Sequence, residues 1–260
     1  TADYLYHHSP VARYFNGIAR AVVEAVVSHL PPHGRLRVLE AGAGTGGTAA
    51  ALLPALPPER TTYYFTDLSD LFLARAAERF GDYPFVRYGL LNLEQGPQEQ
   101  GYGAHSFDLV VGANVFHATR DLDETLQHAR SLLAPGGLLL LYETTTHPVW
   151  FESSIGLIEG WSRFDDAWRQ GNPLLAPQQW QEALLANGFE AVTFWPGSDS
   201  PAAVLGSHVL VAQAPAGEAA VVDPVGERLD TARPAASGAA PAEERAALMR
   251  RRAVDQAIER

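Results

Sequence analysis

The chain has 260 residues, 47% of them hydrophobic, and a formal net charge of −11 at pH 7. This composition is typical of one main domain with a sizeable core, and so acidic a chain argues against binding to a nucleic-acid backbone. The sequence contains no cysteine, and its 19 basic residues other than histidine are all arginine. Disulfides, thiolate nucleophiles, cysteine-ligated metals, Schiff bases and Walker-type phosphate loops are therefore excluded.

No apolar run approaches the about 20 residues of a membrane span, and no signal peptide opens the chain. We therefore expect a protein of the cytoplasm that contacts neither membrane nor nucleic acid. The first residue is threonine rather than methionine, so we also expect the chain to be part of a longer polypeptide.

The amino-terminal part of the sequence predicts one amphipathic helix. Ser9 and Pro10 are typical of a helix start, since a hydroxyl can cap the first turn and proline suits the first helical position. The helix is expected to end before Pro31. Apolar residues recur every three or four positions between these points, which predicts one buried face: Val11, Phe15, Ile18, Val22, Val26 and Leu30.

After this helix, short apolar runs alternate with helical patterns. Strands are predicted at about residues 36–42, 62–67, 85–94, 107–115 and 136–144, with helices among them at about 48–56, 70–80 and 122–133. This alternation predicts a parallel sheet built from right-handed crossovers. A helix at about 178–187 and two strands at about 191–196 and 208–214 follow, and their closing hairpin adds one antiparallel strand.

The pattern divides the chain into three predicted regions. Residues 1–33 form a helical segment that can act as a lid, and residues 34–213 form the α/β core. Residues 214–260 have the composition of an Ala/Pro-rich linker between domains, which can end in an amphipathic helix.

The stretch RVLEAGAGTGGT contains the pattern G-x-G-x-x-G at Gly42, Gly44 and Gly47, directly after a predicted strand. Three interpretations are open: a tight turn without a ligand, a loop for the pyrophosphate of a dinucleotide, or a loop for S-adenosylmethionine (SAM). Glu40 would repel a pyrophosphate, whereas SAM carries a sulfonium and an ammonium that an acidic side chain can attract. The pattern therefore favours SAM over a nicotinamide dinucleotide.

Three further strand ends carry candidate cofactor residues. Asp67, followed by Leu68, ends the second strand, where a carboxylate can accept hydrogen bonds from both ribose hydroxyls or simply cap the next helix. Asn92 and Leu93 follow the third strand, where the amide can reach the adenine amine or belong to an ordinary loop. Asn114 ends the fourth strand, near the predicted switch point at which open α/β sheets bind ligands.

Longer motifs carry a family resemblance: VLEAGAGTGGT, YYFTDLSDLFLARA, GANVFHATRDLDETL, LLAPGGLLLLYETT and GLIEGWSRF, within about residues 4–213. Together they are similar to the SAM-dependent methyltransferase domains of modular type I polyketide synthases. The resemblance implies a class I Rossmann-like methyltransferase fold of the α/β class, with a seven-stranded, mostly parallel sheet and one antiparallel strand in a carboxy-terminal hairpin. It also implies neighbouring synthase domains in the same polypeptide and a substrate bound by thioester to an acyl carrier protein.

His117 and Glu143 are the candidate catalytic pair. They follow the fourth and fifth strands, and because adjacent strands lie about 4.8 Å apart, both side chains can meet above one edge of the sheet. A carboxylate on one ring nitrogen fixes the tautomer of a histidine and makes it a stronger base. In the family that the chain resembles, a His and a Glu in matching segments act as such a pair. The residues alone also allow a helix-capping histidine and a solvated acid.

The expected reaction is methyl transfer without a metal ion, in which His117 deprotonates the β-hydroxyl of a carrier-bound polyketide intermediate and Glu143 orients the imidazole. C-methylation of the α-carbon of a β-ketoacyl thioester by the same pair is the runner-up. We prefer O-methylation because carbon-methylating members of that family carry a larger lid, whereas about 35 residues precede the first strand here. A non-catalytic scaffold domain and a nicotinamide reductase are the other two open classes.

Aromatic and basic residues near the cleft are candidate substrate contacts. Tyr6 and Tyr14 lie in the amino-terminal segment, and Trp161 and Arg163 follow the fifth strand. Each of these groups can line the cleft or pack in the core.

Overall fold

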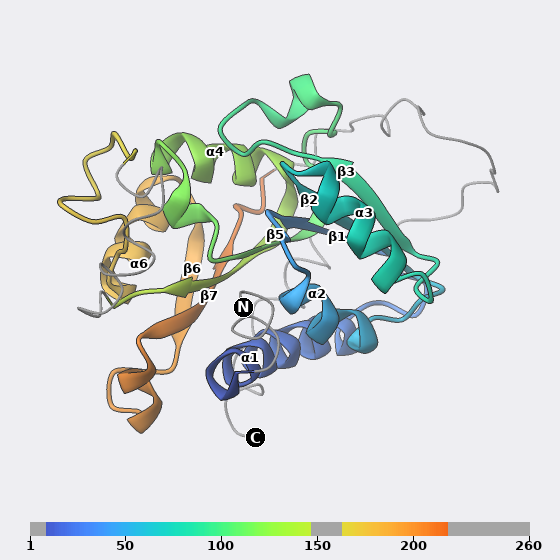
Figure 1. Ribbon diagram of the computed structural model, residues 1–260, viewed down its shortest axis with the longest axis horizontal. Helices are drawn as coiled ribbons and strands as arrows, with labels where there is room; N and C mark the ends of the chain where they lie inside the picture. Colours follow the sequence, from blue (N-terminus) through green and yellow to red (C-terminus); the bar gives the residue numbers. More distant parts are fainter. Residues whose placement is uncertain (1–8, 147–162, 218–260) are drawn as a thin grey trace.

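The computed structural model describes residues 9–146 and 163–217, which fold around one seven-stranded sheet (Figure 1). The strand order is β3-β2-β1-β4-β5-β7-β6, and β7 runs antiparallel to both of its neighbours. The predicted fold class is therefore confirmed, including the antiparallel strand of the closing hairpin. The strands are β1 Leu36–Ala41, β2 Thr61–Asp67, β3 Val86–Leu90, β4 Phe107–Ala113, β5 Leu133–Thr144, β6 Glu190–Trp195 and β7 Ser207–Gln213.

Five α-helices connect and cover the strands in the described residues: α1 Pro10–Ser28, α2 Gly47–Leu52, α3 Asp70–Arg79, α4 Leu122–Leu132 and α6 Pro177–Ala186. Short 3-10 turns lie at η2 Leu53–Ala55, η3 Pro97–Gln100, η4 Phe116–Ala118 and η6 Pro201–Leu205. The predicted start of α1 is correct, because Ser9 accepts a hydrogen bond from the Ala12 N–H at 3.1 Å and Pro10 is the first helical residue. None of the described helices is long and apolar enough to cross a membrane.

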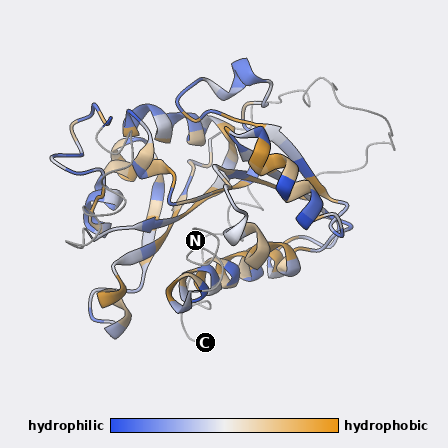
Figure 2. Cartoon of the chain, in the orientation of Figure 1, coloured by the Kyte–Doolittle hydropathy of each residue, from blue (hydrophilic) through white to orange (hydrophobic). Residues whose placement is uncertain are grey.

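Two hydrophobic cores lie on opposite faces of the sheet. On one face α1, α2 and α3 pack against the strands, with Phe15, Leu52 and Phe80 among the buried residues. On the other face α4 and α6 do the same through Leu126 and Trp180. Figure 2 shows hydrophobic and hydrophilic residues interleaved along α1, as expected for a helix that covers a core on one side.

Strand β5 contributes to both cores in alternation. Leu138, Leu140 and Tyr142 face the core under α1, whereas Leu139 and Leu141 face the core under α4. A strand that is covered on both faces needs apolar residues at successive positions, which accounts for the unbroken run LLLLY in the sequence.

The parallel strands bring their carboxyl ends to one edge of the sheet. Connections from β1 and β4, which are neighbours in the sheet, leave toward opposite sides, so this is the point at which the strand order switches direction. The carboxyl ends of β1, β2, β4 and β5 therefore lie at one edge, and with them the predicted site residues Gly42, Asp67, Asn114 and Glu143.

The predicted region boundaries remain predictions. Strand β7 ends at Gln213, and Ala214 is still buried and donates its N–H to the Gly137 carbonyl at 2.8 Å. Residues 1–8, 147–162 and 218–260, and with them the expected terminal helix, lie outside the described residues.

Candidate active site

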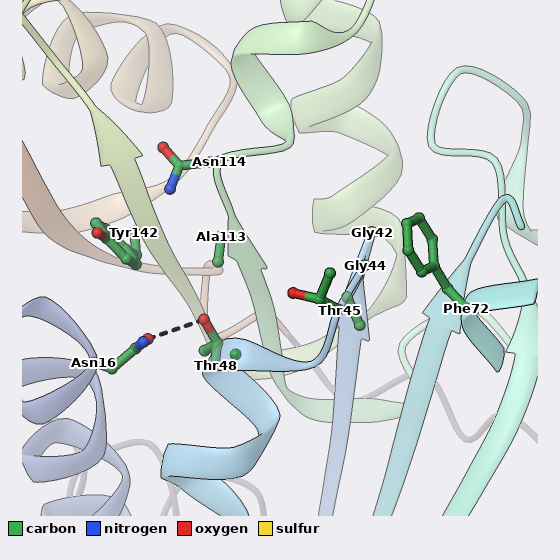
Figure 3. A pocket seen from close by; sticks show the side chains of 11 residues that line it. Asn16, Gly42, Gly44, Thr45, Thr48, Phe72, Ala113, Asn114 and Tyr142 are labelled. Carbon is green, nitrogen blue, oxygen red and sulfur yellow. Dashed lines mark hydrogen bonds between the residues drawn. The ribbon is translucent and has the colours of Figure 1, made fainter. Parts of the chain in front are cut away.

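A cavity of about 240 Å³ opens at the carboxyl edge of the sheet (Figure 3). Its wall is formed by the glycine loop after β1, the ends of β4 and β5, and single residues of α1 and α3. The lining residues are Asn16, Gly42, Ala43, Gly44, Thr45, Gly47, Thr48, Phe72, Ala113, Asn114 and Tyr142. Of the predicted site residues, Gly42, Gly44 and Asn114 thus meet in one wall.

Gly42 is required by geometry as well as by conformation. Its φ is +60°, in the left-handed region, and a Cβ added at this position would lie 2.4 Å from Cγ2 of Val115. Any other residue would therefore push the glycine loop away from the loop that follows β4. Because Gly42 and Gly44 have no side chains, the loop lines the cavity with its backbone at these two positions.

Glu40 is buried beneath the glycine loop and is not part of the cavity wall. Its side chain is almost inaccessible, at 1% exposure, and Oε2 accepts a hydrogen bond from the Tyr63 hydroxyl at 2.7 Å. Burial raises the pKa of Glu40 from 4.5 to about 8, although the hydrogen bond from Tyr63 and the Ala49 N–H act to lower it. Glu40 is therefore not among the residues that line the cavity, and its predicted contribution to cofactor binding remains a prediction.

Asp67 supports the glycine loop from the neighbouring strand. Its Oδ2 accepts a hydrogen bond from the Gly44 N–H at 2.8 Å, and its Oδ1 accepts one from the Ser69 N–H at 2.9 Å. Each carboxylate oxygen can accept further hydrogen bonds, so this arrangement remains compatible with the predicted contact to a ribose. Leu68, the next residue, has a large apolar side chain that is 68% exposed. Such exposure is expected of a side chain whose contact, the adenine ring, is not bound.

Asn92 and Leu93 follow β3 beside the end of β2, because Asp67 pairs in register with Leu90. The Asn92 side-chain oxygen accepts the Glu94 N–H at 2.9 Å, which closes a local turn. Leu93 is buried at 5% exposure. Neither residue lines the cavity, so their predicted contacts to adenine remain predictions.

Asn114 connects the ends of β4 and β5. Its backbone has a left-handed φ of +51°, and its Oδ1 accepts hydrogen bonds at 2.9 Å from both the N–H and the hydroxyl of Thr144. The carbonyl side of the amide is therefore used within the protein, and the NH₂ side is the part that can donate to a ligand in the cavity.

Asn16 of α1 also reaches the cavity, which the sequence reasoning missed. It is buried at 6% exposure, and its Oδ1 accepts a hydrogen bond from the Thr48 hydroxyl of α2 at 3.0 Å (Figure 3). The signal was present in the sequence, because Asn16 follows Phe15 on the apolar face of an amphipathic helix. A polar residue at a buried helical position is unusual and requires a polar neighbour.

His117 and Glu143 meet as predicted. The imidazole Nδ1 lies 2.5 Å from Oε2 of Glu143, and both side chains are buried, at 8% and 0% exposure. Oε1 of Glu143 accepts the N–H groups of Val115 at 3.2 Å and Phe116 at 3.0 Å. The carboxylate therefore holds the backbone of the loop and the ring of its histidine simultaneously, which directs Nε2 away from β5.

Of the four predicted substrate contacts, Tyr14 and Arg163 lie among the described residues. Tyr14 is 42% exposed and lines a separate groove of about 600 Å³ between α1 and the turn after β6. Trp195, at the end of β6, lines the same groove. The structure therefore does not bring Tyr14 to the cavity, because the buried face of α1 presents Asn16 there. Arg163 is exposed, and Tyr6 and Trp161 lie outside the described residues.

The comparisons with known proteins agree on one class of domain. Residues 39–139 match the family model described as "Methyltransferase domain". Polyketide synthase ThaG of Burkholderia thailandensis is 39% identical over 216 residues, which are 81% of this chain but 4% of that protein. The chain thus spans a small part of the curated relatives that it matches.

Solved structures give the same result. The CurJ carbon methyltransferase is 44% identical with a TM-score of 0.79, over 82% of this chain and 57% of that one. The CMeT domain of the citrinin polyketide synthase is 34% identical with a TM-score of 0.74, over 84% and 56%. The trans-methyltransferase CalH, solved with S-adenosylhomocysteine, the demethylated form of SAM, is 32% identical with a TM-score of 0.67, over 78% and 58%.

Proposed function

We propose that this chain, which belongs to the SAM-dependent methyltransferase domains of polyketide synthases, methylates the α-carbon of a β-ketoacyl thioester. An acyl carrier protein carries that thioester. The sequence favoured O-methylation, with C-methylation as the runner-up; C-methylation is now preferred. The solved neighbour CurJ is a carbon methyltransferase, and the citrinin neighbour is a CMeT domain, which favours the runner-up. The length of the amino-terminal part does not enter the choice.

The single observation that carries the mechanism is the buried His117–Glu143 pair, with Nδ1 and Oε2 2.5 Å apart. The α-proton of a β-ketoacyl thioester is acidified by a carbonyl group on each side, so an imidazole is a base of adequate strength. His117 accepts that proton through Nε2, and the electron pair of the C–H bond becomes an enolate whose α-carbon is the nucleophile. That carbon would bond to the methyl group while the methyl–sulfur bond of SAM breaks and its electron pair leaves with S-adenosylhomocysteine. Glu143 stabilises the imidazolium that results.

The residues of the cavity fit SAM as the cofactor. The backbone of the glycine loop is accessible at Gly42 and Gly44, and Asp67 at the loop's base offers carboxylate oxygens to a ribose. When bound, SAM supplies an electrophilic methyl group on a sulfonium, so the protein's task is alignment and not activation by a metal. Asn16 and Asn114 each add an amide to the lining of the cavity, where an NH₂ group can donate to a carboxylate or an enolate oxygen.

The test offers the protein SAM with a β-ketoacyl and a β-hydroxyacyl thioester on the same carrier protein, and fragmentation mass spectrometry locates the added methyl group. We expect the methyl group on the α-carbon of the β-ketoacyl substrate. An α,α-dimethyl β-ketoacyl thioester is the matched control, since it has no α-proton and should not react.

The other outcomes each contradict the proposal in a specific way. A methyl group on the oxygen of the β-hydroxyacyl substrate would establish the O-methylation first expected. SAM binding without transfer to either substrate would favour a scaffold domain. A failure to bind SAM in calorimetry would show that the cavity is assigned to the wrong ligand.

A further inference from the structure

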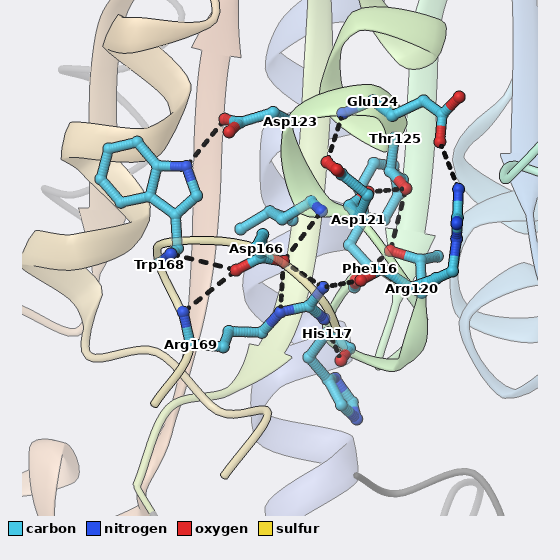
Figure 4. Close-up of polar contacts among 12 residues, drawn as sticks. Phe116, His117, Arg120, Asp121, Asp123, Glu124, Thr125, Asp166, Trp168 and Arg169 are labelled. Carbon is cyan, nitrogen blue, oxygen red and sulfur yellow. Dashed lines mark hydrogen bonds and ion pairs between the residues drawn. The ribbon is translucent and has the colours of Figure 1, made fainter. Parts of the chain in front are cut away.

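The loop between β4 and α4 that carries His117, called the base loop below (residues 114–122), contacts a buried ion pair (Figure 4). Arg169 and Asp166 lie in the described part of the segment that precedes α6, which begins at residue 163. Their side chains are 0% and 2% exposed, respectively. The Arg169 guanidinium donates to Oδ2 of Asp166 through Nε at 2.8 Å and also through a terminal nitrogen. Two donors of one planar guanidinium fix the geometry of this contact, which a single lysine ammonium cannot reproduce.

The remaining donors of Arg169 bind the backbone of the base loop. One terminal nitrogen donates to the carbonyl oxygen of His117 itself at 2.8 Å, and the other donates to the carbonyl oxygen of Arg120 at 3.0 Å. Figure 4 shows the guanidinium lying between Asp166 and this loop. Arg169 therefore fixes the residue that carries the imidazole and the residue three positions further along.

Asp166 binds the far end of the same loop. Its Oδ2 accepts the N–H of Leu122, the first residue of α4, at 3.0 Å, and its Oδ1 accepts the N–H groups of Trp168 and Arg169, each at 3.0 Å. Burial alone would raise the pKa of Asp166, but the hydrogen bonds and the charge of Arg169 hold it below its usual value. The carboxylate is therefore ionised and fully hydrogen-bonded at neutral pH.

The base loop is thus anchored at both ends by charged side chains from other elements. Glu143 holds the N–H groups at its beginning, and the Arg169–Asp166 pair holds its middle and its end. Burying an ion pair is expensive in free energy and contributes little to stability compared with an apolar replacement, so its retention here requires another reason. Placing a general base is such a reason, because an error of about 1 Å in geometry can cost about 10²-fold in rate.

We propose that Arg169 and Asp166 are a positioning pair that sets the place of the His117 imidazole by fixing the backbone of residues 117–122. The proposal rests on the proposed function, in which His117 is the general base. The pair is neutral as a whole, so it orders the loop without opposing the positive charge that the imidazole acquires during the reaction. Glu143 contacts the His117 ring, and His208 pairs with Glu143 across β5 and β7; burial lowers the pKa of His208.

The experiment compares Arg169→Gln, Arg169→Lys and Asp166→Asn with the wild-type chain. Arg20→Gln is the matched control, since Arg20 forms an exposed ion pair with Glu24 on α1. Single-turnover methyl transfer gives the rate, calorimetry gives the SAM affinity, and ¹⁵N NMR of the imidazole in the free protein reports the tautomer of His117 and the surroundings of its ring. The signal of His117 among the nine histidines is assigned with His117→Gln.

We expect Arg169→Gln and Asp166→Asn to lose about 10²-fold in rate while SAM affinity stays within twofold, because the glycine loop does not contact the pair. Arg169→Lys should lose less, since it keeps the charge but not the fork. The ¹⁵N signals of the His117 ring should move in Arg169→Gln and in Asp166→Asn, because the ring leaves its place beside Glu143 when the backbone of its loop shifts. Arg20→Gln should change none of these quantities.

A purely structural role would give another result. Rates within threefold of wild type, a parallel loss of SAM affinity, or His117 ring signals that coincide with those of the wild type would each overturn the proposal. If Arg169→Gln does not fold, the other two variants decide, and if none of the three folds, the pair serves the fold and the proposal is wrong. The NMR measurement requires no substrate, so a wild-type chain that transfers no methyl group would refute the proposed function and still leave the positioning pair tested.

Discussion

His117 and Glu143 act as one unit in the structure, and their variants should show it. His117→Ala is expected to lower the single-turnover rate by about 10²- to 10⁴-fold and to leave SAM affinity nearly unchanged, because a general base acts on the substrate. Glu143→Gln should be of similar severity. Its new NH₂ group must face either the N–H groups of Val115 and Phe116 or the imidazole Nδ1, and the latter contact selects the wrong tautomer.

The double variant should be little worse than His117→Ala alone, because effects of cooperating groups are not additive. Glu24→Gln, at an exposed position of α1, is the control for the loss of one carboxylate. Near-normal rates in His117→Ala would mean that the substrate's proton leaves to another group and that the pair is not catalytic.

Glu40 predicts a pH dependence of stability that is independent of catalysis. Since the folded protein raises its pKa from 4.5 to about 8, the unfolded chain releases this proton at a lower pH than the folded chain does. The free energy of unfolding should therefore fall as pH rises from about 4.5 to about 8, by several kcal/mol in total, as one pKa unit corresponds to about 1.4 kcal/mol.

Glu40→Gln tests this, because the amide keeps the size of the side chain and an acceptor for Tyr63 but cannot ionise. Urea unfolding between pH 5 and pH 9 should show a flatter profile for the variant and a higher stability than wild type above pH 8. Profiles that run parallel would indicate that Glu40 is ionised in the folded protein at neutral pH.

At the scale of single elements, the glycine loop and α1 offer a matched pair of substitutions. Gly42→Ala adds a methyl group 2.4 Å from Val115 at a left-handed φ, so we expect SAM affinity to fall at least tenfold, equivalent to about 1.4 kcal/mol. Gly17→Ala adds the same group to an exposed helical position with nothing within 4 Å. It should stabilise the protein by up to about 1 kcal/mol in thermal unfolding and leave calorimetric SAM binding unchanged. Equal SAM affinities in the two variants would remove the glycine loop from the site.

Most elements could be predicted because each carries a local signal. The 3.6-residue period of α1 and the apolar runs of the strands need no information from distant residues. The turn η4 was missed because Phe116, His117 and Ala118 have no such period, and their conformation depends on the Glu143 carboxylate that accepts the Phe116 N–H.

Within the site, residues at strand ends were predictable and residues brought in by other elements were not. Asn114, His117 and Glu143 follow strands, and parallel strands place their ends together whatever the rest of the chain does. Arg169 lies 52 positions from His117, whose carbonyl group it binds. In the sequence Arg169 is one of 19 arginines and carries no signal of its own. Arg163 was chosen instead because it lies near Trp161 and Phe164.

For the whole molecule, the fold class, the family and SAM as the cofactor of that family were predictable from the sequence, and all three are confirmed. The preference for O-methylation was not confirmed, because it rested on the length of one segment and not on the chemistry of the site. Which residues form the complete independent domain remains a prediction.

A chain that ends at residue 217 should fold and bind SAM like the full chain, because the Ala/Pro-rich sequence beyond it has little apolar surface to bury. Differential scanning calorimetry with and without SAM measures this, and SAM at 100 times its dissociation constant should contribute about 2.7 kcal/mol in both cases. A chain that ends at residue 205 is the control, since it lacks β7, the strand between β5 and β6, and should not fold. A loss of SAM binding in the longer of the two would show that the tail completes the domain.

Val115 joins the cofactor loop to the base loop. Its side chain is what a Cβ at Gly42 would strike, and its N–H is held by the same Glu143 carboxylate that contacts His117. A ligand that displaced the glycine loop would therefore also displace the backbone that carries His117. Any resulting linkage would be reciprocal: a factor by which SAM changed the proton affinity of His117 would be the factor by which that proton changed the affinity for SAM. Such a linkage would make acidity a second effector of cofactor binding, measurable from either ligand.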